Sequence, residues 1–102
     1  MKTVMVRYKT TEAQSAENES LVAAVFGELR SQAPEGLRYA CYRLADGVSF
    51  VHIATLEIPG DNPLTSLPTF QLFQAQLKAR CVELPVVTEL SVVASYASPG
   101  AA

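Results

Sequence analysis

The stretch LRYACYRLADGVSFVHIATLE, residues 37–57, decides the fold of this chain. Two runs rich in apolar, β-branched and aromatic residues, 37–44 and 48–57, flank the tripeptide Ala45-Asp46-Gly47. Asp-Gly between two such runs is a strong short-range signal for a β-hairpin, because both residues tolerate the backbone conformations of a tight turn. The stretch therefore predicts two antiparallel strands in the middle of the chain.

The turn also predicts which side chains share a face of this hairpin. If Asp46 and Gly47 form a two-residue turn, Arg43 lies opposite Phe50, and successive residues then alternate between the two faces. One face carries Tyr39, Cys41, Arg43, Phe50, His52, Ala54 and Leu56. The other face carries Arg38, Ala40, Tyr42, Val51, Ile53 and Thr55. A bulged turn would shift this register by one residue.

A strand and a helix precede the hairpin. Residues 4–8 alternate between apolar and more polar side chains, as in a strand. Thr11 is placed to cap a helix that runs to about Ala33, and residues 34–36, Pro-Glu-Gly, end it. One side of this helix is apolar at helical spacing: Leu21, Val22, Val25, Phe26, Leu29 and Ala33.

A second helix and a last strand follow the hairpin. After a loop rich in Pro and Gly, Ser66 is placed as the cap of a helix that has Pro68 in its first turn. Pro85 then breaks the chain before a β-rich run at residues 86–96, and residues 98–102 are expected to form a flexible tail. The apolar side of the second helix consists of Phe70, Phe73, Leu77 and Cys81.

The element order is therefore β-α-β-β-α-β, which predicts an α+β, ferredoxin-like domain over residues 1–97 with both helices on one face of an antiparallel sheet. The strands carry apolar residues on both sides, so the second face also needs cover. The chain has 102 residues, 49% of them hydrophobic and only 18% charged, and its sequence predicts no third helix to provide this cover. We expect a homodimer through the open sheet face, in which two subunits form a dimeric α+β barrel around a shared cavity.

Composition excludes several classes of function. The net charge is −2 and the basic residues are scattered, which argues against a nucleic-acid partner. No apolar run is long enough to span a membrane and the N-terminus lacks a secretory pattern, so a cytoplasmic protein is expected. Cys41 and Cys81 show no metal-ligand spacing. They are interpreted as two buried thiols, with a single disulfide as the alternative.

The chain resembles the antibiotic biosynthesis monooxygenase-like family of the dimeric α+β barrel superfamily. The resemblance covers nearly the whole element order and is carried by residues 35–39 (EGLRY), Tyr42-Arg43, Phe50-Val51 and residues 68–73 (PTFQLF). The last of these is similar to the family's short helix that opens with a Pro-His-Phe type of sequence. The resemblance implies the fold above and a cofactor-independent oxygenase acting on polycyclic phenols, or a haem-degrading enzyme.

This chain departs from the family pattern at several positions. The family's third strand often ends in Glu-x-Trp, where this chain has Ala54-Thr55-Leu56, and the chain contains no tryptophan. Thr69 stands where the second helix often carries a histidine. Two members of the Asn, Trp and His constellation of the haem-degrading branch have no counterpart, so we expect no haem and no other cofactor.

His52 is the candidate catalytic base, because it is the only histidine and imidazole titrates near neutral pH. In the predicted register it lines the cavity beside Cys41 and near Tyr39 and Arg43. The alternative is a structural histidine whose ring nitrogens are satisfied at a subunit interface. A nucleophilic thiolate–imidazolium pair of Cys41 and His52 is a further, less favoured alternative, and no metal site is expected.

Arg43 is the second candidate catalytic residue, because a cation stabilises a phenolate or carboxylate, and Arg7 could act in the same way. The alternative for both is an ion pair with Glu57 or Glu89 at a solvated rim. The tyrosines 39, 42 and 96 offer hydroxyl donors. The residues expected to bind substrate are Tyr39, Cys41, Phe50, Leu56 and Phe70.

Two functions remain in competition at this point. The first is a cofactor-independent monooxygenase-like enzyme that acts on a small aromatic or polyketide-like substrate. The second is a non-catalytic dimeric barrel that binds a small apolar ligand or serves as an accessory subunit. The single histidine favours the enzyme, whereas the missing tryptophan and helix histidine favour the binding protein.

Overall fold

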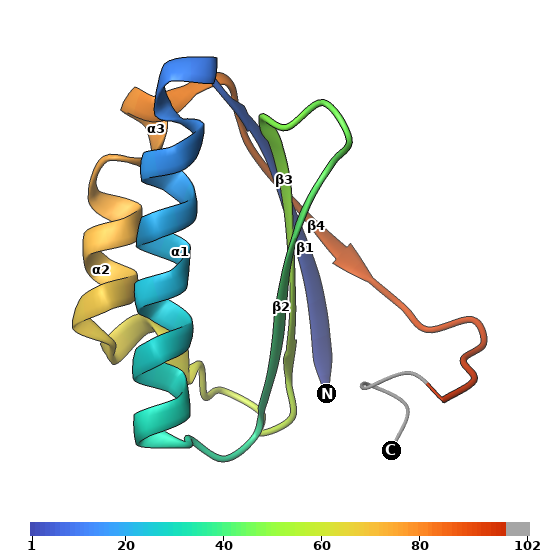
Figure 1. The fold of residues 1–102 in the computed structure, drawn as a ribbon. Helices are drawn as coiled ribbons and strands as arrows, with labels where there is room; N and C mark the ends of the chain where they lie inside the picture. Colours follow the sequence, from blue (N-terminus) through green and yellow to red (C-terminus); the bar gives the residue numbers. More distant parts are fainter. Residues whose placement is uncertain (98–102) are drawn as a thin grey trace.

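The computed structural model describes residues 1–97, which form one four-stranded sheet with all helices on one of its faces (Figure 1). The sheet has the order β2-β3-β1-β4, and each neighbouring pair is antiparallel. This confirms the ferredoxin-like fold; the expected tail at 98–102 lies outside the described residues. The elements are β1 (Lys2–Thr10), α1 (Glu12–Gln32), β2 (Leu37–Arg43), β3 (Ser49–Leu56), the short 3₁₀ helix η1 (Pro63–Ser66), α2 (Pro68–Ala75), α3 (Leu77–Arg80) and β4 (Cys81–Leu90).

The hairpin of β2 and β3 has the predicted register, with Arg43 opposite Phe50 and Cys41 opposite His52. The connection is wider than a two-residue turn, because the ladder closes with the bond from the Leu44 N–H to the Ser49 carbonyl. The connection gains one residue on each side of Asp46-Gly47, so the register of the two strands is unchanged.

The Asp46 carboxylate holds this connection together. It accepts hydrogen bonds from the Val48 N–H, the Ser49 N–H and the Ser49 hydroxyl at 3.0, 2.8 and 2.6 Å. These donors lower the pKa of Asp46 to about 2. Gly47 follows with a φ of +77°, a conformation that favours glycine.

Helix α1 begins and ends close to the predicted residues. The Thr11 hydroxyl accepts a hydrogen bond from the Gln14 N–H at 3.2 Å, so Thr11 is the cap. At the other end Ala33 takes a left-handed conformation, with a φ of 45°, and its N–H bonds the Leu29 carbonyl. Gly36 then turns the chain at a φ of +77°, where a Cβ atom would lie 2.7 Å from the side chain of Ile58.

The second half of the chain departs from the prediction in three places. Helix α2 is preceded by Leu67 without a side-chain cap, because the Ser66 hydroxyl instead donates to the Pro63 carbonyl. Helix α3 ends before Cys81, which begins β4, so the last strand starts ahead of Pro85 and ends at Leu90. The edge position of β4 and the irregular pairing with β1 next to Pro85 explain why a residue without an N–H is tolerated there.

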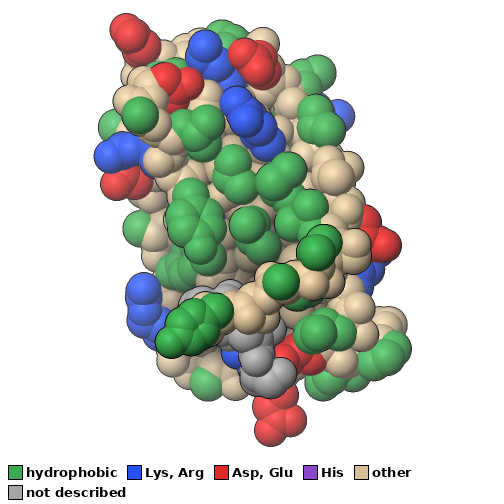
Figure 2. Space-filling model, turned by 90° about the vertical axis from the view of Figure 1, so that its right-hand side faces the viewer, with side chains coloured by type: hydrophobic (Ala, Val, Ile, Leu, Met, Phe, Trp, Pro, Cys, Tyr) green, Lys and Arg blue, Asp and Glu red, His purple; other side chains and the backbone are tan. Residues whose placement is uncertain are grey.

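The two faces of the sheet have different surroundings. Helices α1 and α2 cover one face, which we call the covered face (Figure 1). The buried core lies between this face and the helices and consists of Tyr8, Val25, Phe50, Ala54, Leu64, Leu67, Phe73 and Leu77. The other face, which we call the open face, carries Met5, Arg7, Tyr42, Val51, Ile53 and Val86 by register. Hydrophobic side chains gather in the middle of the open face and charged ones lie around its margin (Figure 2). Among the described residues, no helix has the length and apolar character to cross a membrane.

Candidate functional site

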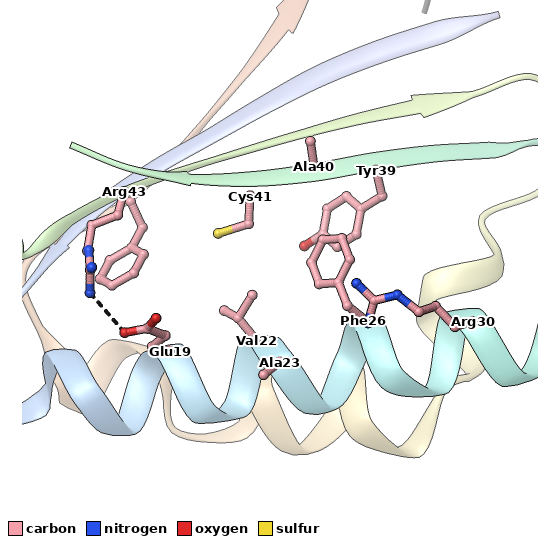
Figure 3. Close-up of a pocket in the computed structure, with 10 residues that line it drawn as sticks. Glu19, Val22, Ala23, Phe26, Arg30, Tyr39, Ala40, Cys41 and Arg43 are labelled. Carbon is pink, nitrogen blue, oxygen red and sulfur yellow. Dashed lines mark hydrogen bonds and ion pairs between the residues drawn. The ribbon is translucent and has the colours of Figure 1, made fainter. Parts of the chain in front are cut away.

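A cavity of about 520 Å³ lies between α1 and β2 (Figure 3). Its volume falls within the range of small-molecule sites in proteins. The exposed side chains of Glu19 and Arg30 contribute to its lining, so the cavity is open to solvent. It is lined by Glu19, Val22, Ala23, Phe26 and Arg30 from α1, and by Tyr39, Ala40, Cys41, Arg43 and Phe50 from the β2–β3 hairpin.

Aromatic rings form the walls of the cavity and charged groups lie at its two ends. The rings of Phe26 and Tyr39 are stacked, with centroids 5.0 Å apart and an interplanar angle of 4°. At one end the Arg43 guanidinium donates to the Glu19 carboxylate at 2.8 Å, and Arg30 lies toward the other end (Figure 3). Such walls suit an aromatic ligand. Because the Glu19 carboxylate offsets Arg43, the net positive charge of the lining comes from Arg30, and it suits a ligand with negative charge.

The hydroxyl of Tyr39 is held by His52 behind the cavity wall. The Nδ1 atom of His52 lies 2.6 Å from the Tyr39 hydroxyl, and its Nε2 atom lies 2.7 Å from the Tyr8 hydroxyl. The Cys41 sulfur lies 3.4 Å from the same Nε2. Both ring nitrogens of His52 are therefore engaged, and only 4% of its surface is exposed.

Further buried hydrogen bonds connect His52 and Tyr8 to helix α3. The Asn18 amide donates to the Tyr8 hydroxyl at 2.8 Å, and the Arg80 Nε–H donates to the Asn18 amide oxygen at 3.1 Å. The Arg80 guanidinium also donates to the Phe73 carbonyl at 2.9 Å and lies over the Phe73 ring. We call the run Arg80–Asn18–Tyr8–His52–Tyr39 the polar chain. It joins residues from α3, α1, β1, β3 and β2.

Burial favours the uncharged forms of four groups in this region: the His52 ring, the Cys41 thiol and the hydroxyls of Tyr8 and Tyr39. It lowers the pKa of His52 to about 4 and raises the pKa of the Cys41 thiol to about 11. It also raises the pKa of the hydroxyls of Tyr8 and Tyr39. These directions are opposite to those that a thiolate–imidazolium pair of Cys41 and His52 requires. Within residues 1–97, no group of three His, Cys, Asp or Glu side chains is placed to hold a metal ion.

The structure brings four of the predicted site residues to one cavity: Tyr39, Cys41, Arg43 and Phe50. His52 lies behind this group, and Arg43 is paired with Glu19 instead of Glu57 or Glu89. Leu56 lines a separate hollow with Ile58 near the N-terminus, and Phe70 packs on Phe73 in the core. Arg7 is exposed on the open face, away from the cavity.

The expectation that the face with Tyr39 and His52 points toward a second subunit is wrong. The face that carries Tyr39 and His52 is the one that the helices cover, as the contacts of Tyr39 with Phe26 and of His52 with Phe73 show. The cavity therefore lies within a single chain, between α1 and the sheet. Strand alternation separates the two sets of side chains but does not say which set the helices cover.

Sequence reasoning missed Asn18, Arg80 and the α1 side of the cavity. One signal was present for Asn18, because it precedes Leu21, Val25 and Leu29 on the apolar stripe of the helix, where a polar residue is unexpected. It is fully buried. Arg80 likewise follows Phe73 and Leu77 at helical spacing and is buried.

Comparisons with known proteins give matches in structure only. No protein-family model matches the chain, and no curated protein matches it in sequence. Rv0793 from Mycobacterium tuberculosis is similar with a TM-score of 0.74 and 24% identity, over 95% of this chain and 98% of that one. A variant of SnoaB, a cofactor-independent oxygenase from Streptomyces nogalater, gives a TM-score of 0.69 and 21% identity, over 95% and 97% of the two chains.

A third structure, described as a putative antibiotic biosynthesis monooxygenase from Nitrosomonas europaea, gives a TM-score of 0.76 at 11% identity, over 92% of this chain and 100% of that one. At such identities the likeness concerns the fold. The chain thus has the fold of the antibiotic biosynthesis monooxygenase proteins, as its resemblance to that family predicts.

Proposed function

We propose that this protein is a cofactor-independent monooxygenase-like enzyme that oxidises a small aromatic or polyketide-like phenol in the α1/β2 cavity. The observation that carries the proposal is the Tyr39 hydroxyl, held at 2.6 Å by His52 in a cavity with aromatic walls and arginines at its ends. The similar fold of SnoaB, an oxygenase described as cofactor-independent, supports the same reaction class.

The chemistry requires an anionic substrate, which the cavity is equipped to hold. The substrate loses a proton from its methylene group or from the hydroxyl of the corresponding enol, and Tyr39 and Arg43 stabilise the resulting oxyanion. The electron-rich carbon of that anion then reacts with O₂. One oxygen atom replaces two hydrogens of a methylene group as a carbonyl, and the other oxygen atom leaves as water. The substrate supplies all the electrons.

The roles of the ionisable residues follow from their positions. His52 contacts Tyr8, Tyr39 and Cys41 with its ring nitrogens, and its low pKa disfavours proton uptake near neutrality. We therefore give His52 the role of positioning the Tyr39 hydroxyl, and we propose Glu19, whose carboxylate lies at the cavity end, as the group that receives the substrate proton.

We also propose that two copies associate through the open face. Two strand residues are exposed on this face, Val86 to 62% and Tyr42 to 56%. Val92 and Ser95 share a hollow with Tyr42 and Ile53, so the segment after β4 lies along one end of this face (Figure 2). A second copy would bury the remainder. The free thiols of Cys41 and Cys81 fit a reducing compartment such as the cytoplasm.

Oxygen uptake with 1,8-dihydroxyanthrone as substrate tests the enzymatic proposal. Tyr39→Phe is expected to lower the rate about 10²- to 10³-fold, as the loss of a donor to a developing oxyanion does. Tyr42→Phe removes the same atom from the same strand on the open face, so it is the matched control and should keep the wild-type rate. Equal rates in Tyr39→Phe and the wild type would refute the proposed role of Tyr39.

A non-catalytic binding protein is the second candidate, because the only histidine has both ring nitrogens engaged behind the cavity wall. This candidate predicts that the protein binds 1,8-dihydroxyanthraquinone, the oxidised form of the same ring system, without accelerating oxygen uptake by the anthrone. Quenching of tyrosine fluorescence measures the binding, and an oxygen electrode measures the rate.

A further inference from the structure

The directions of the hydrogen bonds in the polar chain are set by its first member. A guanidinium has only donors, so the Asn18 side chain must present its oxygen to Arg80 and its NH₂ group to Tyr8. The Tyr8 hydroxyl accepts that bond, and its own hydrogen is left for the Nε2 atom of His52. Nε2 is therefore an acceptor.

The tautomer of His52 follows from this order. A neutral imidazole with an unprotonated Nε2 carries its hydrogen on Nδ1, and burial keeps the ring neutral. The Nδ1–H then donates to the Tyr39 oxygen at 2.6 Å. The Cys41 sulfur lies farther from Nε2, at 3.4 Å, and the single lone pair of Nε2 is directed at the Tyr8 hydrogen, so Cys41 does not set the tautomer.

We infer that the polar chain holds the Tyr39 hydroxyl as a hydrogen-bond donor toward the α1/β2 cavity, so that the cavity selects ligands with an acceptor oxygen, a carbonyl or a phenolate, at that point. Arg80 and Asn18 are positioning residues in this scheme, since they act on the ligand only through Tyr8 and His52. The inference rests on the proposed function only in placing the ligand in this cavity.

Nuclear magnetic resonance of ¹⁵N-labelled protein tests the scheme directly, because the chain contains a single histidine. Long-range ¹H–¹⁵N correlations of the ring show which nitrogen carries the hydrogen. We expect the Nδ1–H tautomer at pH 7. An Nε2–H tautomer or an imidazolium in the wild type overturns the inference, and this measurement requires no variant and no ligand.

Asn18→Asp reverses the chain while it keeps the shape of the side chain. A carboxylate accepts from Arg80 and also from the Tyr8 hydroxyl, so Nε2 must donate to Tyr8 and Nδ1 must accept from Tyr39. The tautomer is expected to change to Nε2–H. Asn62→Asp, in the exposed loop before η1, is the matched control and should leave the Nδ1–H tautomer in place. An unchanged tautomer in Asn18→Asp overturns the role of Asn18.

The ligand class is tested with 4-nitro-1-naphthol, whose phenolate and phenol forms differ in absorption. The wild type is expected to bind the phenolate in preference to the phenol. Tyr39→Phe, Tyr8→Phe and Asn18→Asp should each weaken phenolate binding about ten- to a hundredfold, the effect of one hydrogen bond to a charged acceptor. Tyr8→Phe adds no charge, so it separates hydrogen-bond direction from electrostatic repulsion. Tyr96→Phe, exposed and outside the sheet, is the control.

The outcomes of these tests separate the two proposals. Failure of the wild type to bind the phenolate, or equal binding in Tyr39→Phe, overturns the ligand class inferred for the cavity. If the protein shows the expected tautomer and binds the phenolate but takes up no oxygen, the inference is supported and only the enzymatic function is contradicted.

Discussion

The covered and open faces of the sheet are built from the same strands but differ in how their polar and apolar side chains are placed. The covered face buries polar groups together with its core, and every buried side-chain nitrogen or oxygen among the described residues has a hydrogen-bond partner. The open face leaves apolar side chains such as Val86 and Tyr42 in solvent. A hydrogen-bonded face is complete within one chain, whereas an exposed apolar patch is typical of a surface that associates with a partner.

The largest effect on the free energy of unfolding is expected from Arg80→Met, which removes buried hydrogen bonds on the covered face. The change leaves the acceptors of Asn18 and Phe73 buried without their donor. Each such group costs about 1–3 kcal/mol, so the free energy of unfolding should fall by about 3–5 kcal/mol in urea denaturation. Arg7→Met is the control, because Arg7 is exposed on the open face, and a change of about 0.5 kcal/mol or less is expected there. Equal losses in both variants would contradict a difference between the faces.

Acidification should lower the stability of the protein through His52 on the covered face. Burial lowers the pKa of His52 in the folded protein to about 4, below the 6.5 of an exposed histidine. The unfolded chain therefore binds more protons between these values, and the stabilisation is complete above pH 6.5 and is lost as the pH falls toward 4. The loss should reach about 3 kcal/mol relative to a His52→Gln variant, measured by urea denaturation at each pH. An imidazolium signal already present at pH 6 would contradict the assignment.

A third prediction would break the open face. Val86→Glu places a carboxylate opposite Arg7 on the neighbouring strand, so the single subunit tolerates it, but a second copy would have to bury the charge. The dimer dissociation constant should rise about tenfold or more, equivalent to about 1.4 kcal/mol or more. Light scattering across a dilution series measures it. Leu72→Glu is the matched control on helix α2, because Leu72 and Val86 are both 62% exposed. A monomeric wild type would refute the proposed association.

The smallest effect on the free energy of unfolding is expected from Glu19→Gln at the exposed end of the cavity. The ion pair of Glu19 with Arg43 has the same 2.8 Å length as the bond from Asn18 to Tyr8. Glu19 is exposed, however, whereas Asn18 is fully buried, so solvent screens the first contact and not the second. The free energy of unfolding of Glu19→Gln, measured by thermal unfolding, should be lower than that of the wild type by about 1 kcal/mol or less. A larger loss would show that contact length and not burial sets the contribution.

The fold could be read from the sequence because its signals are local. Asp46 and Gly47 predict the hairpin register through a turn that involves only neighbouring residues, and Thr11 predicts the helix start in the same way. The extent of β4 differs from the predicted one, because Pro85 suggests a break and only the edge position of the strand in the sheet makes this proline acceptable.

The site could be read only in part. The face shared by Tyr39, Cys41, Arg43 and Phe50 follows from the hairpin register. The polar chain does not, because its members come from five elements and meet only when the sheet and helices pack. The covered side of the sheet was also beyond the sequence pattern, since both faces carry apolar residues and the helices could cover either one.

The alternation of side chains along β2 has a consequence for how this protein can diversify. The residues at 39, 41 and 43 face the cavity or its wall, while the side chains at 38 and 42 project to the opposite side of the same strand, as does the side chain of Ala40, although Ala40 also contributes to the cavity lining (Figure 3). Substitutions that drift in one set need not disturb the other. Descendants of one ancestral gene could therefore exchange ligands while they keep their assembly, or change assembly while they keep their ligand, without a new strand or loop.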